Sequence, residues 1–314
     1  MRQPLSSLTR WVVACVLAVL ATGAMAETET LVFGFLDVNG TFTTIAVPGV
    51  SRTFASGIND TRQIVGDFSD GTGTHGFLYD SGIFRTIDVP GSNYTSVTGI
   101  NNIGQMVGVY NTSSSNDTHG FLYSGGTFST LDKPGATDTI LYGINDAGHM
   151  VGFSRTDAFI TEGFLYAGGT FSPIAVAGAL SNDARGINNV GQIVGASVYF
   201  TGAEGFLYTG GTFSAINVPG VVDTVPNGVN DAGQIVGYAN RGTDGFLYSG
   251  GTFRTYEINI PGATDAAPYD INNAGDIVGT YALVVPEPGT LVLFGVGLLG
   301  LVRGWRHSRA AGAD

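Results

Sequence analysis

Cysteine and lysine are almost missing from this chain, and each absence excludes a class of chemistry. Cys15 is the only cysteine and lies near the N-terminus, so the rest of the chain can form no disulfide and use no catalytic thiol. Lys133 is the only lysine, and residues 27–284 contain 23 acidic and 8 basic residues. Such a surface repels nucleic acid and anionic lipid, which excludes nucleic-acid binding and suits an extracellular protein or a cation binder.

Long stretches of helical periodicity are missing too, as are the short motifs of common enzymes. The chain has no Gly-x-Ser-x-Gly elbow, no Walker phosphate loop, no His-Glu-x-x-His and no Asp-x-Asp-x-Asp-Gly calcium loop. Its Gly-Gly pairs lie between strand-like segments, where we expect hairpin turns. We therefore expect an all-β protein that is not an enzyme and has no cofactor.

The N-terminal residues have the three parts of a secretory signal peptide. Arg2 and Arg10 give a positively charged N-terminal region, and an uncharged apolar run covers 11–20. Ala24 and Ala26 then form a small-x-small cleavage site. The apolar run is shorter than the ~20 residues that span a bilayer, which argues against an uncleaved anchor. We predict a signal peptide over 1–26 and export of the mature chain.

The C-terminal residues 285–314 have a second three-part pattern. The motif at 285–290 contains Pro286, Glu287 and Pro288, an apolar run covers 291–302, and a basic end at 303–309 includes Arg303, Arg306 and Arg309. This pattern resembles the PEP-CTERM sorting signal recognised by exosortases of Gram-negative bacteria. The resemblance implies processing near Pro-Glu-Pro and delivery to the cell envelope, outer surface or extracellular matrix.

The apolar run and the basic end have a physical logic of their own. An apolar segment halts export in the membrane, and a basic cluster stays on the cytoplasmic side. Before processing, the chain is therefore expected to be held in the membrane by 291–302. An ordinary single-pass C-terminal anchor with a chance Pro-Glu-Pro is the alternative interpretation.

The middle of the chain is an internal repeat. Three short strings recur six times in the same order, with spacings of 40 to 44 residues between copies of the first. Gly-Phe-Leu begins at Gly34, Gly76, Gly120, Gly163, Gly205 and Gly245. Gly-Ile/Val-Asn, or Asp-Ile-Asn in the last copy, ends at Asn59, Asn101, Asn145, Asn188, Asn230 and Asn272. Ile/Met-Val-Gly ends at Gly66, Gly108, Gly152, Gly195, Gly237 and Gly279.

Each repeat of about 42 residues reads as four short strands separated by turn residues, which is typical of a propeller blade. We predict a six-bladed β-propeller over 27–284. If each blade begins at the Gly-Ile-Asn strand, 31–48 and 270–283 together complete one blade and close the ring; a blade that begins at Gly-Phe-Leu is the alternative. An open β-solenoid is the rival architecture. Arg62 replaces a turn glycine in the first copy, so that turn should be strained or differently shaped.

The repeats also resemble the HAF repeat of bacterial extracellular proteins. The segments 75–79 and 119–123 (His-Gly-Phe-Leu-Tyr) match its opening, and 145–152 and 230–237 match its closing. Glu162, Glu204 and Asp244 stand where the first two copies have histidine. The resemblance implies export and a repeat fold, and it brings no established chemistry.

Several recurrent side chains are candidates for function, and for most of them a structural role is the simpler interpretation. The six asparagines are expected to bond to their own turns. His75 and His119 are expected to be hydrogen-bonded rather than metal ligands. The tyrosines that close the first strand are expected to pack between blades or over the hairpin: Tyr79, Tyr123, Tyr166, Tyr208 and Tyr248. Asp138, Asp223 and Asp265 are weak candidates for calcium.

Taken together, these patterns predict an exported structural or interaction protein of the cell surface or matrix. Its expected partners are an exosortase and either extracellular polysaccharide or other envelope proteins. Two alternatives stay open: a carbohydrate-active hydrolase or lyase that uses the propeller mouth, and a calcium-dependent adhesion module.

Overall fold

The computed structural model describes residues 28–112, 117–156, 161–240, 244–258 and 260–286. The predicted signal peptide, Glu287, Pro288 and the basic end of the sorting tail lie outside these residues. Leu31–Leu283 forms one compact unit, and the described residues beyond it are the ends of the first and last strands. The elements assigned in the described residues are 24 strands, which confirms the all-β prediction.

The strands form six antiparallel units of four strands each, called blades below; parallel pairs of Val32 with Arg52 and of Thr74 with Tyr94 join three of them into one larger sheet. In the first three blades the strands are β3 (Arg52–Ile58), β4 (Ile64–Ser69), β5 (Thr74–Asp80) and β6 (Ile83–Ile87); β7 (Ser92–Ile100), β8 (Met106–Thr112), β9 (His119–Ser124) and β10 (Thr127–Thr130); β11 (Asp138–Ile144), β12 (Met150–Arg155), β13 (Thr161–Ala167) and β14 (Thr170–Ile174).

The other three blades continue the pattern, and the last draws on both ends of the chain. Their strands are β15 (Ser181–Ile187), β16 (Ile193–Tyr199), β17 (Gly202–Thr209) and β18 (Thr212–Ala215); β19 (Thr224–Val229), β20 (Ile235–Ala239), β21 (Asp244–Ser249) and β22 (Thr252–Tyr256); β23 (Ala263–Ile271), β24 (Ile277–Pro286), β1 (Thr28–Val38) and β2 (Thr41–Ile45).

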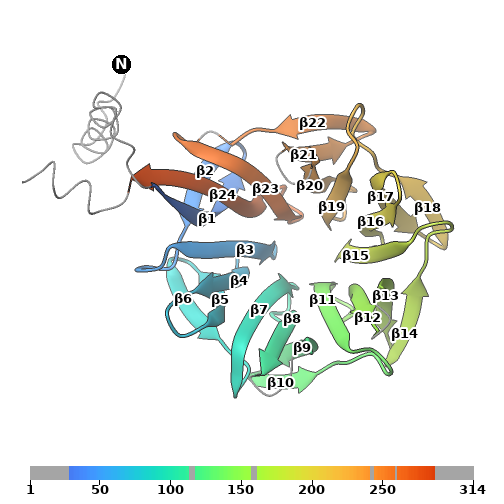
Figure 1. Cartoon of the computed structure of the whole chain (residues 1–314), viewed down its shortest axis with the longest axis horizontal. Coiled ribbons are helices and arrows are strands. Elements are labelled where there is room, and N and C mark those ends of the chain that lie inside the picture. Colours follow the sequence, from blue (N-terminus) through green and yellow to red (C-terminus); the bar gives the residue numbers. More distant parts are fainter. Residues whose placement is uncertain (1–27, 113–116, 157–160, 241–243, 259, 287–314) are drawn as a thin grey trace, which may run out of the picture. The chain divides into compact units, whose positions relative to one another are not determined.

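The sixth blade settles where each blade begins. Its sheet order is β23-β24-β1-β2, so the N-terminal and C-terminal strands pair with one another. Figure 1 shows β1 and β2, in blue, beside β23 and β24, in orange and red. Each blade therefore starts with the strand that ends in Gly-Ile-Asn, and the ring is closed rather than an open solenoid. Figure 1 also shows β3, β7, β11, β15, β19 and β23 innermost.

Each innermost strand carries a β-bulge at the residue before the motif glycine or its replacement. The register with the second strand skips one residue in every blade, at Ser56, Thr98, Tyr142, Arg185, Asn227 and Tyr269. A bulge bends the strand and re-aims the extra side chain. It also explains Ile-Val-Gly, because a Cβ on Gly152 would lie 1.9 Å from the Ile140 carbonyl oxygen, and the equivalent glycines are as tight.

The hydrophobic core lies between neighbouring blades. The phenylalanine of each Gly-Phe-Leu is at its centre, with 0 to 3% of its surface exposed: Phe35, Phe77, Phe121, Phe164, Phe206 and Phe246. Phe121 of the second blade, for example, packs in one cluster with Val65 and Ile87 of the first. Burying one such ring stabilises the fold by about 1.5–3 kcal/mol, and no blade can bury its ring alone.

The six recurrent asparagines join the blades in a closed ring of hydrogen bonds. Each Oδ1 accepts the backbone N–H four residues on, as in a turn, at 2.8–3.0 Å. Each Nδ2 donates to the backbone carbonyl of the equivalent asparagine in the next blade at 2.9–3.2 Å, and Asn272 donates back to Asn59. The predicted turn role is correct but incomplete, because the same side chain also holds the ring together.

The first-copy turn keeps the shape of the others. Arg62 has φ 63°, close to the 74–82° of its glycine equivalents, so a side chain is held in the left-handed conformation that glycine favours. Its guanidinium reaches Asp276 of the sixth blade, with Nε 2.8 Å from Oδ2. Asp276 replaces a residue that is glutamine in four other copies. Two departures from the repeat therefore compensate one another where the first and last blades meet.

Candidate functional site

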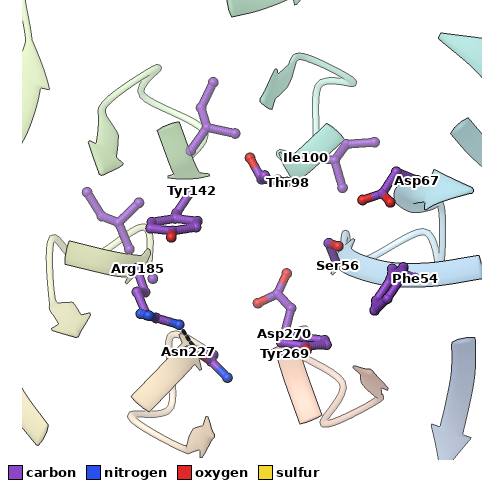
Figure 2. A pocket seen from close by; sticks show the side chains of 15 residues that line it. Phe54, Ser56, Asp67, Thr98, Ile100, Tyr142, Arg185, Asn227, Tyr269 and Asp270 are labelled. Carbon is purple, nitrogen blue, oxygen red and sulfur yellow. Dashed lines mark hydrogen bonds between the residues drawn. The ribbon is translucent and has the colours of Figure 1, made fainter. Parts of the chain in front are cut away.

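A cavity of about 250 Å³ lies at the centre of the ring, and the bulged residues line it. Figure 2 shows Ser56, Thr98, Tyr142, Arg185 and Asn227 around this cavity, each from a different innermost strand. Because the bulge leaves these residues out of the sheet register, their side chains are free of cross-strand pairing. The blades agree with one another in the core and in the turns, and they differ at these positions.

Asp270 is the strongest departure from the repeat in this cavity. It stands where the other five blades have Gly57, Gly99, Gly143, Gly186 and Gly228. Its Oδ2 accepts the backbone N–H of Ile58 at 3.0 Å, and Oδ1 accepts that of Ile271 at 2.9 Å. Burial nevertheless raises the pKa of Asp270 to about 7, because removal from water disfavours the charged form more than the two amides favour it.

A second carboxyl of the cavity, Asp67, comes from β4 of the first blade. The hydroxyl of Ser96 in the second blade donates to its Oδ1 at 2.6 Å. Burial raises the pKa of Asp67 to about 6, opposed by this hydrogen bond and by the charge of Arg52. The cavity therefore contains two carboxyl groups that titrate close to neutral pH.

The opposite wall is built around Arg185. Its guanidinium pairs with Asp183 at 2.7 Å and donates through Nη1 to Oδ1 of Asn227 at 3.1 Å. It also lies over the ring of Tyr142, 5.3 Å from the centroid, which is within the range of a cation–π contact. Because Asp183 offsets the buried charge, Arg185 holds Asn227 and Tyr142 in place instead of presenting a free cation.

The asparagine ring borders a second, smaller hollow. The residue after each ring asparagine forms an outer ring in which aspartate and asparagine alternate: Asp60, Asn102, Asp146, Asn189, Asp231 and Asn273. Each backbone N–H donates to the side-chain oxygen of the next blade's residue at 2.7–2.9 Å. Asn102 and Asn273 also donate Nδ2 hydrogens to the carboxylates on both sides.

The three aspartates considered for calcium are used elsewhere or lie apart. Asp138 accepts the backbone N–H of Thr118 and pairs with Arg155 at 2.6 Å. Asp223 accepts the N–H of Ala203 at 2.8 Å, and Asp265 is an exposed residue of β23. Within the described residues no group of three or more His, Cys, Asp or Glu side chains is arranged to hold a metal ion.

The histidines and tyrosines have the structural contacts that were expected of them. His75 and His119 bond through Nδ1 to Asp88 and Asp132 at 2.7 and 2.8 Å, and the bond to Asp88 raises the pKa of His75. The five tyrosines pack on the phenylalanine of the adjoining outer strand at 4.7–4.8 Å between centroids, over the hairpin.

The cavity residues were not predicted from the sequence, although a signal for them was present. The Asp-Ile-Asn of the sixth copy, at the position of Gly-Ile-Asn, already marked Asp270 as different. The residue before each motif glycine is Ser, Thr, Tyr, Arg, Asn or Tyr in the six copies, which is unusual variety within an otherwise regular repeat. In this repeat the positions that vary between copies therefore point to the cavity, and the positions that recur do not.

Comparison with known proteins supports the tail and the fold. Residues 284–309 match the family described as the PEP-CTERM protein-sorting motif. Proteins with this motif are exported and sorted to the cell surface, so the chain is an exported protein with an exosortase sorting signal. No curated protein matches the sequence. In the described residues no helix is long and apolar enough to cross a membrane, and the run 291–302 lies outside them.

Two solved structures show the fold class. TolB from Acinetobacter baumannii is 12% identical, with a TM-score of 0.52 over 91% of this chain and 75% of that one. A putative TolB from Agrobacterium tumefaciens is 11% identical, with a TM-score of 0.52 over 83% of this chain and 99% of that one. Both are β-propeller proteins, so this chain has a propeller fold. The HAF resemblance of the repeats stays a prediction.

Proposed function

We propose that this protein is a structural or interaction module of the cell surface or extracellular matrix, whose six-bladed propeller binds exopolysaccharide in the central cavity. It is delivered there after exosortase processing near Pro286, Glu287 and Pro288. Binding without turnover is the proposed activity. The observation that carries the proposal is the variety of the bulged residues around a cavity whose supporting residues repeat.

The chemistry of these side chains suits a sugar. Sugar rings present C–H groups on their faces and hydroxyl groups at their edges. Tyr142 and Tyr269 offer aromatic surface to the faces. The hydroxyl of Ser56 and the carboxyl of Asp270 offer donors and acceptors to the edges. The Nδ2 of Asn227 bonds to the Pro268 carbonyl through one hydrogen and has a second hydrogen to donate. An apolar cavity with a few convergent polar groups is the usual form of a small-ligand site.

The test is a glycan array followed by calorimetry on residues 27–286, which include every strand of the closed ring. Tyr142→Ala and Asn227→Ala should each weaken binding about tenfold or more, because each removes one side chain of the cavity. Phe200→Ala is the matched control, since Phe200 is 94% exposed in the β16–β17 hairpin. Absence of glycan binding, or equal loss in the control, would contradict the proposal.

A carbohydrate-active enzyme is the second candidate, and Asp67 and Asp270 favour it. Carboxyl groups with raised pKa values in one cavity are the pattern of a general acid. A hydrolysis and lyase screen against the glycans that bind separates the two functions. Turnover that Asp270→Asn abolishes while binding persists would establish the enzyme and overturn the binding-only proposal.

A further inference from the structure

A third hollow, distinct from the one at the asparagine ring and called the outer groove below, adjoins the central cavity on the side of the second blade. It has a volume of about 730 Å³, and its walls include Asn93, Tyr94, Ser96, Asn111 and Tyr142. These side chains come from β7, β8 and β11, so the groove lies over the inner strands of two neighbouring blades. Its lining combines amide, hydroxyl and aromatic side chains with two aliphatic ones, Val109 and Ile140, and no charged side chain is among the lining residues.

The outer groove and the central cavity lie next to each other. Thr98 and Tyr142 line both of them. Ser96 lines the groove, and its hydroxyl donates to Asp67 of the cavity at 2.6 Å. A ligand seated in the cavity against Tyr142 therefore lies next to the groove.

Tyr94 pairs through its backbone with Thr74 of the first blade, and its side chain differs from those at the same position in the other blades. The equivalent residues of the other blades are Arg52, Asp138, Ser181, Asp223 and Asp265. Asp138 and Asp223 each accept a backbone N–H from the preceding blade through their carboxylates. The second blade has the phenol ring of Tyr94 at this position instead of a carboxylate. Tyr94 is 38% exposed, a large amount for an aromatic ring next to a cavity.

The two tyrosines form the ends of one recognition surface. Tyr142 is held by Arg185 at the border of the cavity, and Tyr94 stands in the groove with part of its ring open to solvent.

We propose that the site is extended: the central cavity binds one sugar residue, and the outer groove binds the adjoining residues of the same chain, with Tyr94 as their stacking surface. The inference rests on the proposed function and specifies its ligand as a chain of several neutral sugars rather than a monosaccharide. The sizes agree, since 250 Å³ is below and 730 Å³ is within the ~300–1,000 Å³ of ordinary ligand sites.

The experiment measures affinity against chain length. Exopolysaccharide purified from the producing bacterium is partly hydrolysed, sized into fragments of increasing length, and titrated into residues 27–286. Fragments of several residues should bind about tenfold tighter than the shortest fragment that binds. Tyr94→Ala should remove this gain and leave the affinity for the shortest fragment unchanged, whereas Tyr142→Ala should weaken every length.

Two controls separate the outcomes. Tyr94→Phe keeps the ring and should keep the gain, and Phe200→Ala should match the unchanged protein at every length. Affinity that does not rise with length, or a gain that survives Tyr94→Ala, overturns the extended site and leaves the cavity proposal standing. Failure of every fragment to bind overturns both, and equal unfolding temperatures of the variants show that the fold is intact.

Discussion

The asparagine ring gives a sharp test, because a turn role and a ring role predict different results for Asn145→Asp. An aspartate can still accept the backbone N–H groups of Ala147 and His149, now bonded at 3.1 and 3.0 Å. It cannot donate to the Asn188 carbonyl, which the amide of Asn145 reaches at 3.1 Å. If the asparagine served its turn alone, the change would be nearly neutral.

The magnitude follows from the contacts. Asn145 is only 4% exposed, so the lost donor is replaced by a buried carboxylate oxygen that faces a carbonyl oxygen. One lost hydrogen bond costs about 0.5–1.5 kcal/mol and an unsatisfied buried group about 1–3 kcal/mol. The carbonyl of Asn188 keeps the N–H of Gly191, which limits the cost. We expect about 1–3 kcal/mol, or a fall of roughly 2–10 °C in Tm for a domain of this size.

Thermal unfolding followed by circular dichroism measures the effect, and pH checks its cause. Burial should raise the folded-state pKa of the new aspartate above its unfolded value of about 4. Stability is then lost as pH rises through the folded pKa and recovers below about pH 4, where the protonated carboxyl can donate to Asn188 again.

Asn217→Asp, made together with Glu204→His, is the matched control for this change. Only the side-chain oxygen of Asn217 is used, as acceptor for the N–H of Gly205, and two sister blades carry Asp88 and Asp132 at the same place. In those blades the aspartate pairs with His75 or His119, whereas Glu204 stands at that place beside Asn217. Asn217→Asp combined with Glu204→His reproduces the sister blades and should therefore be close to neutral. If Asn145→Asp is equally neutral at pH 7, the asparagines do not hold the blades together and the reasoning is refuted.

Three further predictions concern two residues that depart from the repeat, Arg62 and Asp270, and one glycine that every copy shares, Gly152. Arg62→Gly should lower Tm because Asp276 loses its partner, and adding Asp276→Gln should restore the Tm. Arg62 lowers the pKa of Asp276 in the folded protein. The loss of Tm in Arg62→Gly should therefore be largest above pH 4 and should shrink as pH falls. Gly152→Ala should lower Tm sharply or prevent folding, because the new Cβ would lie 1.9 Å from the Ile140 carbonyl oxygen. Asp270→Asn should flatten the loss of stability expected as pH rises through about 7, and unfolding curves from pH 5 to 8 that coincide with those of the unchanged protein would contradict the raised pKa.

The repeat made much of this fold predictable from sequence. The strands follow from Gly-Phe-Leu and Ile-Val-Gly. The sequence left two possible starting points for each blade, and the pairing of β1 with β24 decides between them. That pairing joins residues at opposite ends of the chain, and no local pattern encodes it. The bulge was hidden for a similar reason, because it is a relation between two strands and becomes visible only in their register.

The cavity was less predictable because its side chains do not recur from blade to blade, whereas the residues that recur are structural. The asparagines recur because every blade must hold its neighbour, and Asp138 bonds to Thr118 and Arg155. Asp67, Arg185 and Asp270 are each unlike their equivalents in the other blades, and they meet only because the ring brings the inner strands of all six blades to one cavity. A search of the repeat for positions that vary without disturbing the fold would have found them.

The outer ring shows how variation inside a repeat can itself be structural. Asp and Asn alternate from Asp60 to Asn273. Asn102 and Asn273 each give both amide hydrogens to the carboxylates on either side, and Asn189 gives one to Asp231 at 3.2 Å. Alternation of two residue types closes only on an even number of blades, because an odd ring would bring two carboxylates or two amides together. Two adjacent carboxylates would repel and lack a shared donor. The alternation of Asp and Asn between copies therefore fits a closed ring with an even number of blades, as in the six blades of this fold.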